Sequence, residues 1–132
     1  MDSSQLLLER LTLLRDSWPN PPWTWDSRFQ TVAASFSKEM EPDARKSAMN
    51  AFPRGWTTKS LENAPPDMQA IAERTGGLRS GQRLLAGDEM FAPKLFALWW
   101  PWGGGDTITL RIGVDGATPE LIAAIRDLFG AH

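Results

Sequence analysis

An alternating segment near the C-terminus, residues 107–114, constrains the fold more than any other feature. Its apolar positions are Ile108, Leu110, Ile112 and Val114. Because successive side chains of a strand point to opposite faces, this alternation predicts a strand with one buried and one mostly polar face. The preceding run Gly103-Gly104-Gly105-Asp106 predicts a turn, and residues 95–100 predict a second strand before it. The two strands are therefore expected to form an antiparallel hairpin.

The first strand of this hairpin leads into the sequence Trp99-Trp100-Pro101-Trp102. In a strand, Trp100 and Trp102 share one face and Trp99 lies on the other. If helices cover both faces, every indole belongs to the core. If one face stays open, an exposed indole is suited to a protein hot spot or to stacking on a sugar or base. Pro101 cannot donate to a ladder, so it marks an edge, a bulge or the end of the strand.

Before the hairpin the apolar spacing is mostly helical. It predicts helices over residues 4–17, 27–40, 43–51 and 66–74, and a short strand over 82–86. After the hairpin, residues 118–129 predict a C-terminal helix. The helix at 27–40 rests on Phe29, Val32, Ala33, Phe36 and Met40. The resulting order is three or four N-terminal helices, a small antiparallel sheet of two or three strands, and a C-terminal helix. This order predicts the α+β class.

Length and composition favour one cytoplasmic domain. A chain of 132 residues suits a single compact domain, residues 1–132. It has no cysteine, which excludes disulfides and thiolate sites and fits a reducing compartment. The N-terminus lacks the basic start of a signal peptide, and no apolar run approaches the ~20 residues of a membrane span. With a net charge of −2, the chain has no basic footprint for nucleic acid.

The residues available for catalysis are few. The one histidine is His132, the last residue, which disfavours histidine catalysis and zinc sites of cysteine and histidine. The remaining candidates for acid–base chemistry are the carboxylates Asp88, Glu89, Asp106 and Asp115. Three of them adjoin glycine, an arrangement more typical of turns. We therefore predict no enzymatic activity, no metal and no cofactor.

The segment Arg74–Arg83 is the best candidate for a small-ligand site. It holds three arginines, three glycines and no acidic residue. Glycines let backbone amides approach an anion, and arginine binds carboxylate or phosphate through two parallel hydrogen bonds. The segment lacks the lysine of a P-loop and the spacing of a dinucleotide fingerprint, so a helix cap with solvated arginines is the alternative. Arg111, on the polar face of the last strand, is a further candidate. The predicted binding residues are Trp99, Trp100, Trp102, Arg79, Arg83 and Arg111.

Two function classes remain. The first is a small cytoplasmic module that binds another protein, such as an inhibitor or immunity-type protein that neutralises a toxin or effector. The second is a domain that binds an anion, sugar or nucleotide, with the glycine–arginine segment holding the anion and a tryptophan stacking on a ring. An enzyme built on carboxylates and arginines is a third class, to which no spacing points. We predict a protein partner and no binding of nucleic acid or membranes.

Overall fold

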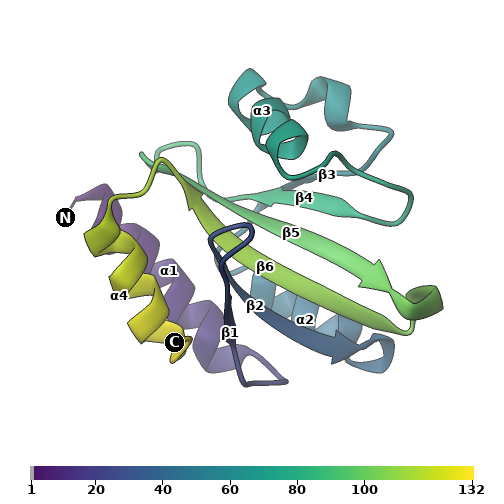
Figure 1. Cartoon of the computed structure of the whole chain (residues 1–132), viewed down its shortest axis with the longest axis horizontal. Coiled ribbons are helices and arrows are strands. Elements are labelled where there is room, and N and C mark those ends of the chain that lie inside the picture. Colours follow the sequence, from purple (N-terminus) through teal and green to yellow (C-terminus); the bar gives the residue numbers. More distant parts are fainter. Residues whose placement is uncertain (1) are drawn as a thin grey trace.

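A six-stranded antiparallel sheet forms the centre of the molecule, with the strand order β1-β2-β6-β5-β4-β3 (Figure 1). The computed structural model describes residues 2–132. Its strands are β1 (Thr24–Asp26), β2 (Thr31–Ser37), β3 (Arg54–Trp56), β4 (Arg83–Ala86), β5 (Lys94–Trp102) and β6 (Thr107–Asp115). The predicted hairpin is confirmed as β5–β6, which pairs from Lys94↔Asp115 to Trp102↔Thr107.

Four α-helices accompany the sheet: α1 (Ser3–Ser17), α2 (Glu41–Ala48), α3 (Pro66–Arg74) and α4 (Pro119–Phe129). The helices predicted at 4–17, 66–74 and 118–129 are confirmed to within one or two residues. The cap of α1 is Asp2, whose side chain accepts the Gln5 N–H in a reciprocal capping box, and Thr118 caps α4. No helix among residues 2–132 has the length and apolar character to cross a membrane.

The predicted fold class was wrong in its architecture, although the α+β content holds. The sheet has six strands instead of two or three, and the helices are not gathered before it. The largest error is the helix predicted at 27–40, where the chain forms β2 and a short 3-10 turn at Lys38–Met40. Val32, Ala34 and Phe36 face the core at a spacing of two residues. Apolar residues four apart fit both a helix and every second position of a strand, so the helical spacing was not decisive.

A tight turn explains why no helix begins before β2. Asp26 Oδ1 accepts the Arg28 N–H at 2.9 Å, and Gln30 adopts a positive φ of 54°. An aspartate accepts a backbone N–H two or three residues ahead both in such a turn and at the start of a helix, so its presence before residue 27 does not distinguish the two structures. The chain instead reverses over residues 27–30 and places β2 beside β1. At the other edge of the sheet, the unassigned segment 54–65 supplies β3.

Helices cover each face of the sheet over only some of its strands. On one face, α1, α2 and α4 pack over β1, β2, β6 and β5 around a core that includes Phe36, Trp99 and Leu110. On the other face, α3 packs over β3, β4 and β5 through Met68 and Ile71. Figure 1 shows α1 and α4 side by side, with α3 apart from them at the β3–β4 end. One half-face is therefore left open on each side of the sheet.

Candidate functional site

The open half on the α3 side forms a broad concave surface, which we term the concave face. Strands β2, β6 and β5 make its floor, and the proline segment before β1 makes one wall. It is defined by Pro22, Arg28, Ser35, Trp102, Thr109 and Arg111. The surface encloses about 960 Å³ and is open to solvent along its length. Residues from the two halves of the chain thus meet at one surface.

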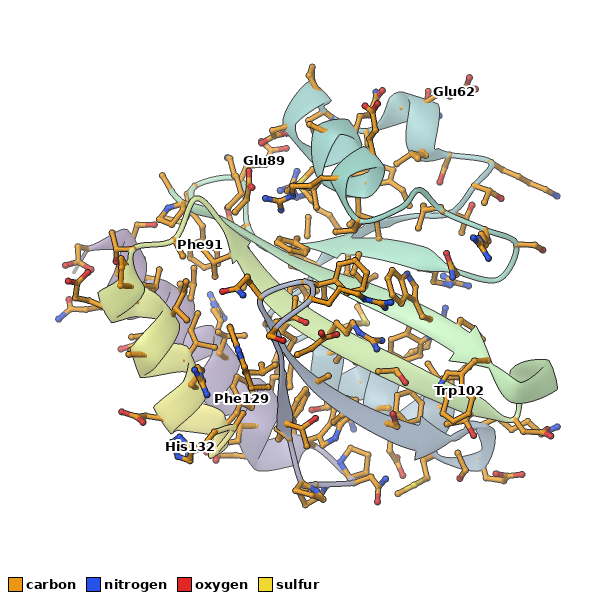
Figure 2. All side chains as sticks on the ribbon, in the orientation of Figure 1. Glu62, Glu89, Phe91, Trp102, Phe129 and His132 are labelled. Carbon is orange, nitrogen blue, oxygen red and sulfur yellow. The ribbon has the colours of Figure 1, made fainter. Side chains whose placement is uncertain are left out.

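Trp102 is the most exposed aromatic side chain among residues 2–132, at 56%. Its indole Nε1 donates to Thr109 Oγ1 at 2.9 Å, and that hydroxyl lies 2.8 Å from Ser35 Oγ. In Figure 2, Trp102 lies by the β5–β6 turn, at the far end of the sheet from Phe91. The hydrogen bond holds a large apolar ring in a fixed orientation on the surface. A fixed, exposed ring is suited to contact with another molecule.

A cation–aromatic cluster occupies the part of the concave face next to the β1–β2 turn. Phe29 packs edge-on against Trp100, with ring centroids 5.3 Å apart. The Arg111 guanidinium lies 5.0 Å from the Trp100 ring centroid, and its Nε donates to Asp26 Oδ2 at 2.8 Å. The Trp100 indole nitrogen is buried and has no acceptor among the described residues. The turn thereby covers Trp100 and leaves Trp102 open.

The net charge of this cluster depends on the protonation state of Asp26. Burial raises the pKa of Asp26, but the hydrogen bond from Arg111, the Arg28 backbone N–H and the positive charge of Arg111 together bring that pKa below its ordinary value. Asp26 is therefore ionised at neutral pH and compensates Arg111. Arg28 forms no ion pair among residues 2–132, and its guanidinium lies 4.2 Å from the Phe29 ring centroid. The concave face consequently carries one uncompensated positive charge.

The structure brings together three of the six predicted binding residues. Trp100, Trp102 and Arg111 all line the concave face. Trp99 is buried on the opposite side of the sheet, where its ring packs 5.2 Å from that of Phe36. Arg83 pairs with Trp99 in the β4–β5 ladder and lies on that same side.

Arg79 and its neighbours lie apart from the exposed tryptophan. Arg79 is exposed in the loop between α3 and β4 and is not among the residues that line the concave face. The whole segment Arg74–Arg83 contributes only Gln82 to that surface. The predicted glycine–arginine patch beside an exposed tryptophan therefore does not form.

Sequence reasoning missed Asp26, Arg28, Ser35 and Thr109 as parts of this surface. The first three lie within, or directly before, the segment 27–40 that was predicted as a helix, so their position on a hairpin was not foreseen. The signal that was available is the run of residues 31–37, where Val32, Ala34 and Phe36 occupy every second position and three of the other four residues are serine or threonine. Such alternation indicates a strand with one polar face.

The candidate carboxylates lie in separate turns and ion pairs. Asp88 Oδ1 accepts the Met90 N–H, Asp106 lies 3.3 Å from Lys38 Nζ, and Asp115 lies 2.7 Å from Arg74. Glu89 lies 3.4 Å from Arg54. Among residues 2–132 there is no group of three or more histidine, cysteine, aspartate or glutamate side chains placed to hold a metal ion.

Comparison with protein-family models, curated proteins and solved structures finds no match to this chain. The assignment of a function therefore depends on the concave face itself.

Proposed function

We propose that this protein is a protein-binding module whose concave face takes a segment of a partner protein. The observation that carries the proposal is the exposed indole of Trp102, which the Thr109 hydroxyl holds in place. Tryptophan and arginine are the residues that most often dominate the energetics of protein interfaces. A pocket for a small ligand encloses most of that ligand, whereas this surface is open along its length.

The distribution of charge on the concave face favours a partner segment that carries a negative charge. Asp26 compensates Arg111, and Arg28 is left with its positive charge stacked on Phe29. We expect the partner segment to place a carboxylate against Arg28 and an apolar side chain on Trp102. Ser35 lies exposed on the floor of this surface, and its hydroxyl offers a hydrogen bond to the segment's backbone.

A narrower form of the proposal is an inhibitor or immunity-type protein that neutralises a toxin or effector in the cytoplasm. A rigid sheet with an anchored indole needs little rearrangement on binding, which favours tight inhibition. The alternative, a small-ligand site built from the glycine–arginine segment and an exposed tryptophan, has less support. Arg83 lies on the opposite side of the sheet from Trp102, so the two cannot hold one small ligand.

The test compares capture of a partner by matched variants of the full chain. The tagged wild type, Trp102→Ala and Arg28→Glu are used as baits in extract of the source cells, with Leu13→Ala as the control. Leu13 is 49% exposed on α1, outside the concave face. We expect one stoichiometric protein to be retained by the wild type and by Leu13→Ala and to be lost with both other variants. Equal retention by Trp102→Ala, or no stoichiometric protein on the wild type, would contradict the proposal.

A further inference from the structure

A second open region lies on the opposite side of the sheet, where α1, α2 and α4 leave β3 and β4 uncovered. Here the C-terminal part of α2, β3, β4 and Trp99 of β5 surround a cleft of about 270 Å³. We term it the arginine cleft and define it by Arg45, Arg54, Arg83, Met49, Leu85 and Trp99. It shares no lining residue with the concave face. It is therefore independent of the function proposed above.

The cleft carries more positive charge than the neighbouring carboxylates compensate. Three arginines line it and no carboxylate does. Arg54 is engaged, since its guanidinium donates to the Gly87 carbonyl at 2.8 and 3.1 Å and lies 3.4 Å from Glu89. Among residues 2–132, neither Arg45 nor Arg83 forms an ion pair or a side-chain hydrogen bond. Two guanidinium groups with free donors are thus available at the cleft.

Apart from Thr57, the other side chains that line the cleft are mostly apolar. Met49 is 67% exposed at its rim, Leu85 is half-buried, and Trp99 closes the bottom. Gly55 on β3 lets the edge strand approach closely, because a Cβ there would lie 2.9 Å from Leu85 Cδ2. An exposed methionine adapts its flexible side chain to ligands of different shape. The cleft therefore joins an apolar floor to a positively charged rim.

We infer that the arginine cleft binds a small organic carboxylate with an aromatic or aliphatic body. A carboxylate has the charge opposite to that of the two free arginines, and a guanidinium can bind it through two parallel hydrogen bonds, while the apolar body covers Leu85 and Met49. The volume lies just below the range of about 300–1,000 Å³ typical of pockets for drug-sized ligands. It suits a compact acid rather than a folded protein surface. The competing account is that Arg45 only complements the C-terminal end of α2 and that Arg83 is only solvated.

The probe that tests this inference is 2-naphthoate, with the neutral 2-naphthamide as its matched control. Each compound is titrated into the full chain, and the backbone amide of Gly55 and the indole N–H of Trp99 are followed by NMR. We expect 2-naphthoate to shift both signals to saturation and 2-naphthamide to bind about tenfold more weakly. The Trp102 indole signal, on the concave face, is expected to stay unchanged.

Variants then assign the charge preference to particular residues. Arg83→Gln and Arg45→Gln are each expected to weaken 2-naphthoate binding by about tenfold. Arg10→Gln, an exposed arginine on α1 outside the cleft, is expected to leave it unchanged. The inference would be overturned by equal affinity for the two compounds or by shifts confined to Trp102. Unaltered binding in the variant that carries both Arg45→Gln and Arg83→Gln would overturn it as well. None of these outcomes depends on partner capture at the concave face, so the two proposals fail separately.

Discussion

The indole nitrogen of Trp102 and the hydroxyl of Thr109 are joined by a 2.9 Å hydrogen bond across the β5–β6 hairpin. The two residues are diagonal neighbours, since Trp102 pairs with Thr107 and Thr109 pairs with Trp100. The bond orients an aromatic side chain that is 56% exposed. Preorganisation of this kind lowers the entropy lost when a surface binds a partner.

Thr109→Val tests this orientation directly, because valine keeps the shape of threonine and removes the acceptor. We expect Trp102 to become mobile and the free energy of unfolding to fall by about 1 kcal/mol, the typical net value of one hydrogen bond. NMR relaxation of the Trp102 indole N–H and urea denaturation measure the two effects. Ser35→Ala removes the other hydroxyl partner while sparing the indole, and so serves as the control. An indole signal as rigid in Thr109→Val as in the wild type would contradict the role given to this bond.

Truncation of neighbouring tryptophans should have opposite consequences for stability and binding. Trp99 is only 3% exposed, so Trp99→Ala is expected to cost about 3–5 kcal/mol of stability. Trp102→Ala removes a mostly exposed ring and should cost far less, while abolishing partner capture. Urea denaturation of both variants checks the difference. Similar losses of stability in the two would mean that the concave face is more tightly packed than its exposure indicates.

The ion pair between Asp26 and Arg111 predicts a dependence of stability on pH. The pKa of Asp26 is lowered in the folded protein, so its contribution is fully present above the unfolded pKa of about 3.9 and is lost as pH falls through the folded value. Asp26→Asn is therefore expected to be less stable than the wild type at pH 7, by on the order of 1 kcal/mol. The gap should narrow below pH 4. Thermal denaturation at pH 7 and pH 3 measures it, and a constant gap would argue against the assigned pKa shift.

Gly113 on β6 lies against the ring of Phe96, where a Cβ would come within 2.6 Å of Cζ and 3.0 Å of Thr31 Cγ2. Gly113→Ala is therefore expected to destabilise the protein by about 1–3 kcal/mol through overpacking. Phe96→Leu should relieve part of this strain. In a double-mutant cycle monitored by urea denaturation, the combined loss is then smaller than the sum of the single losses. Additive losses would show that the contact with Phe96 is not the cause.

Local sequence patterns were enough to predict α1, α3, α4 and the β5–β6 hairpin. In these elements the caps, the glycine turn and the alternation of residues 107–114 all favour one structure. The pattern failed at residues 27–40, where apolar spacing fits a helix and a strand equally and only pairing with β6 decides between them. β3 is three residues long and carries no periodic signal of its own. The number of strands was underestimated because the outer strands of the sheet are stabilised by partners distant in sequence.

In the candidate site, too, local patterns predicted some residues, whereas others depend on contacts between distant parts of the sequence. Trp100, Trp102 and Arg111 could be placed on one face because they belong to a single hairpin with a readable register. Asp26 reaches Arg111 across 85 residues of sequence, and no local pattern reveals that approach. The burial of Trp99 likewise depends on which helices cover which half of the sheet. The arrangement of the helices, rather than the composition of β5, decides which indole meets solvent.

Even-numbered and odd-numbered side chains of β5 lie on opposite faces of the sheet. Even positions such as Trp100 and Trp102 face the α3 side, and odd positions such as Trp99 face the side of α1, α2 and α4. The two openings share a backbone but no side chain. A substitution among the side chains of one opening can therefore leave the side chains of the other unchanged. A single residue inserted in β5, by contrast, would turn the side chains that follow it to the opposite face and so change both openings at once.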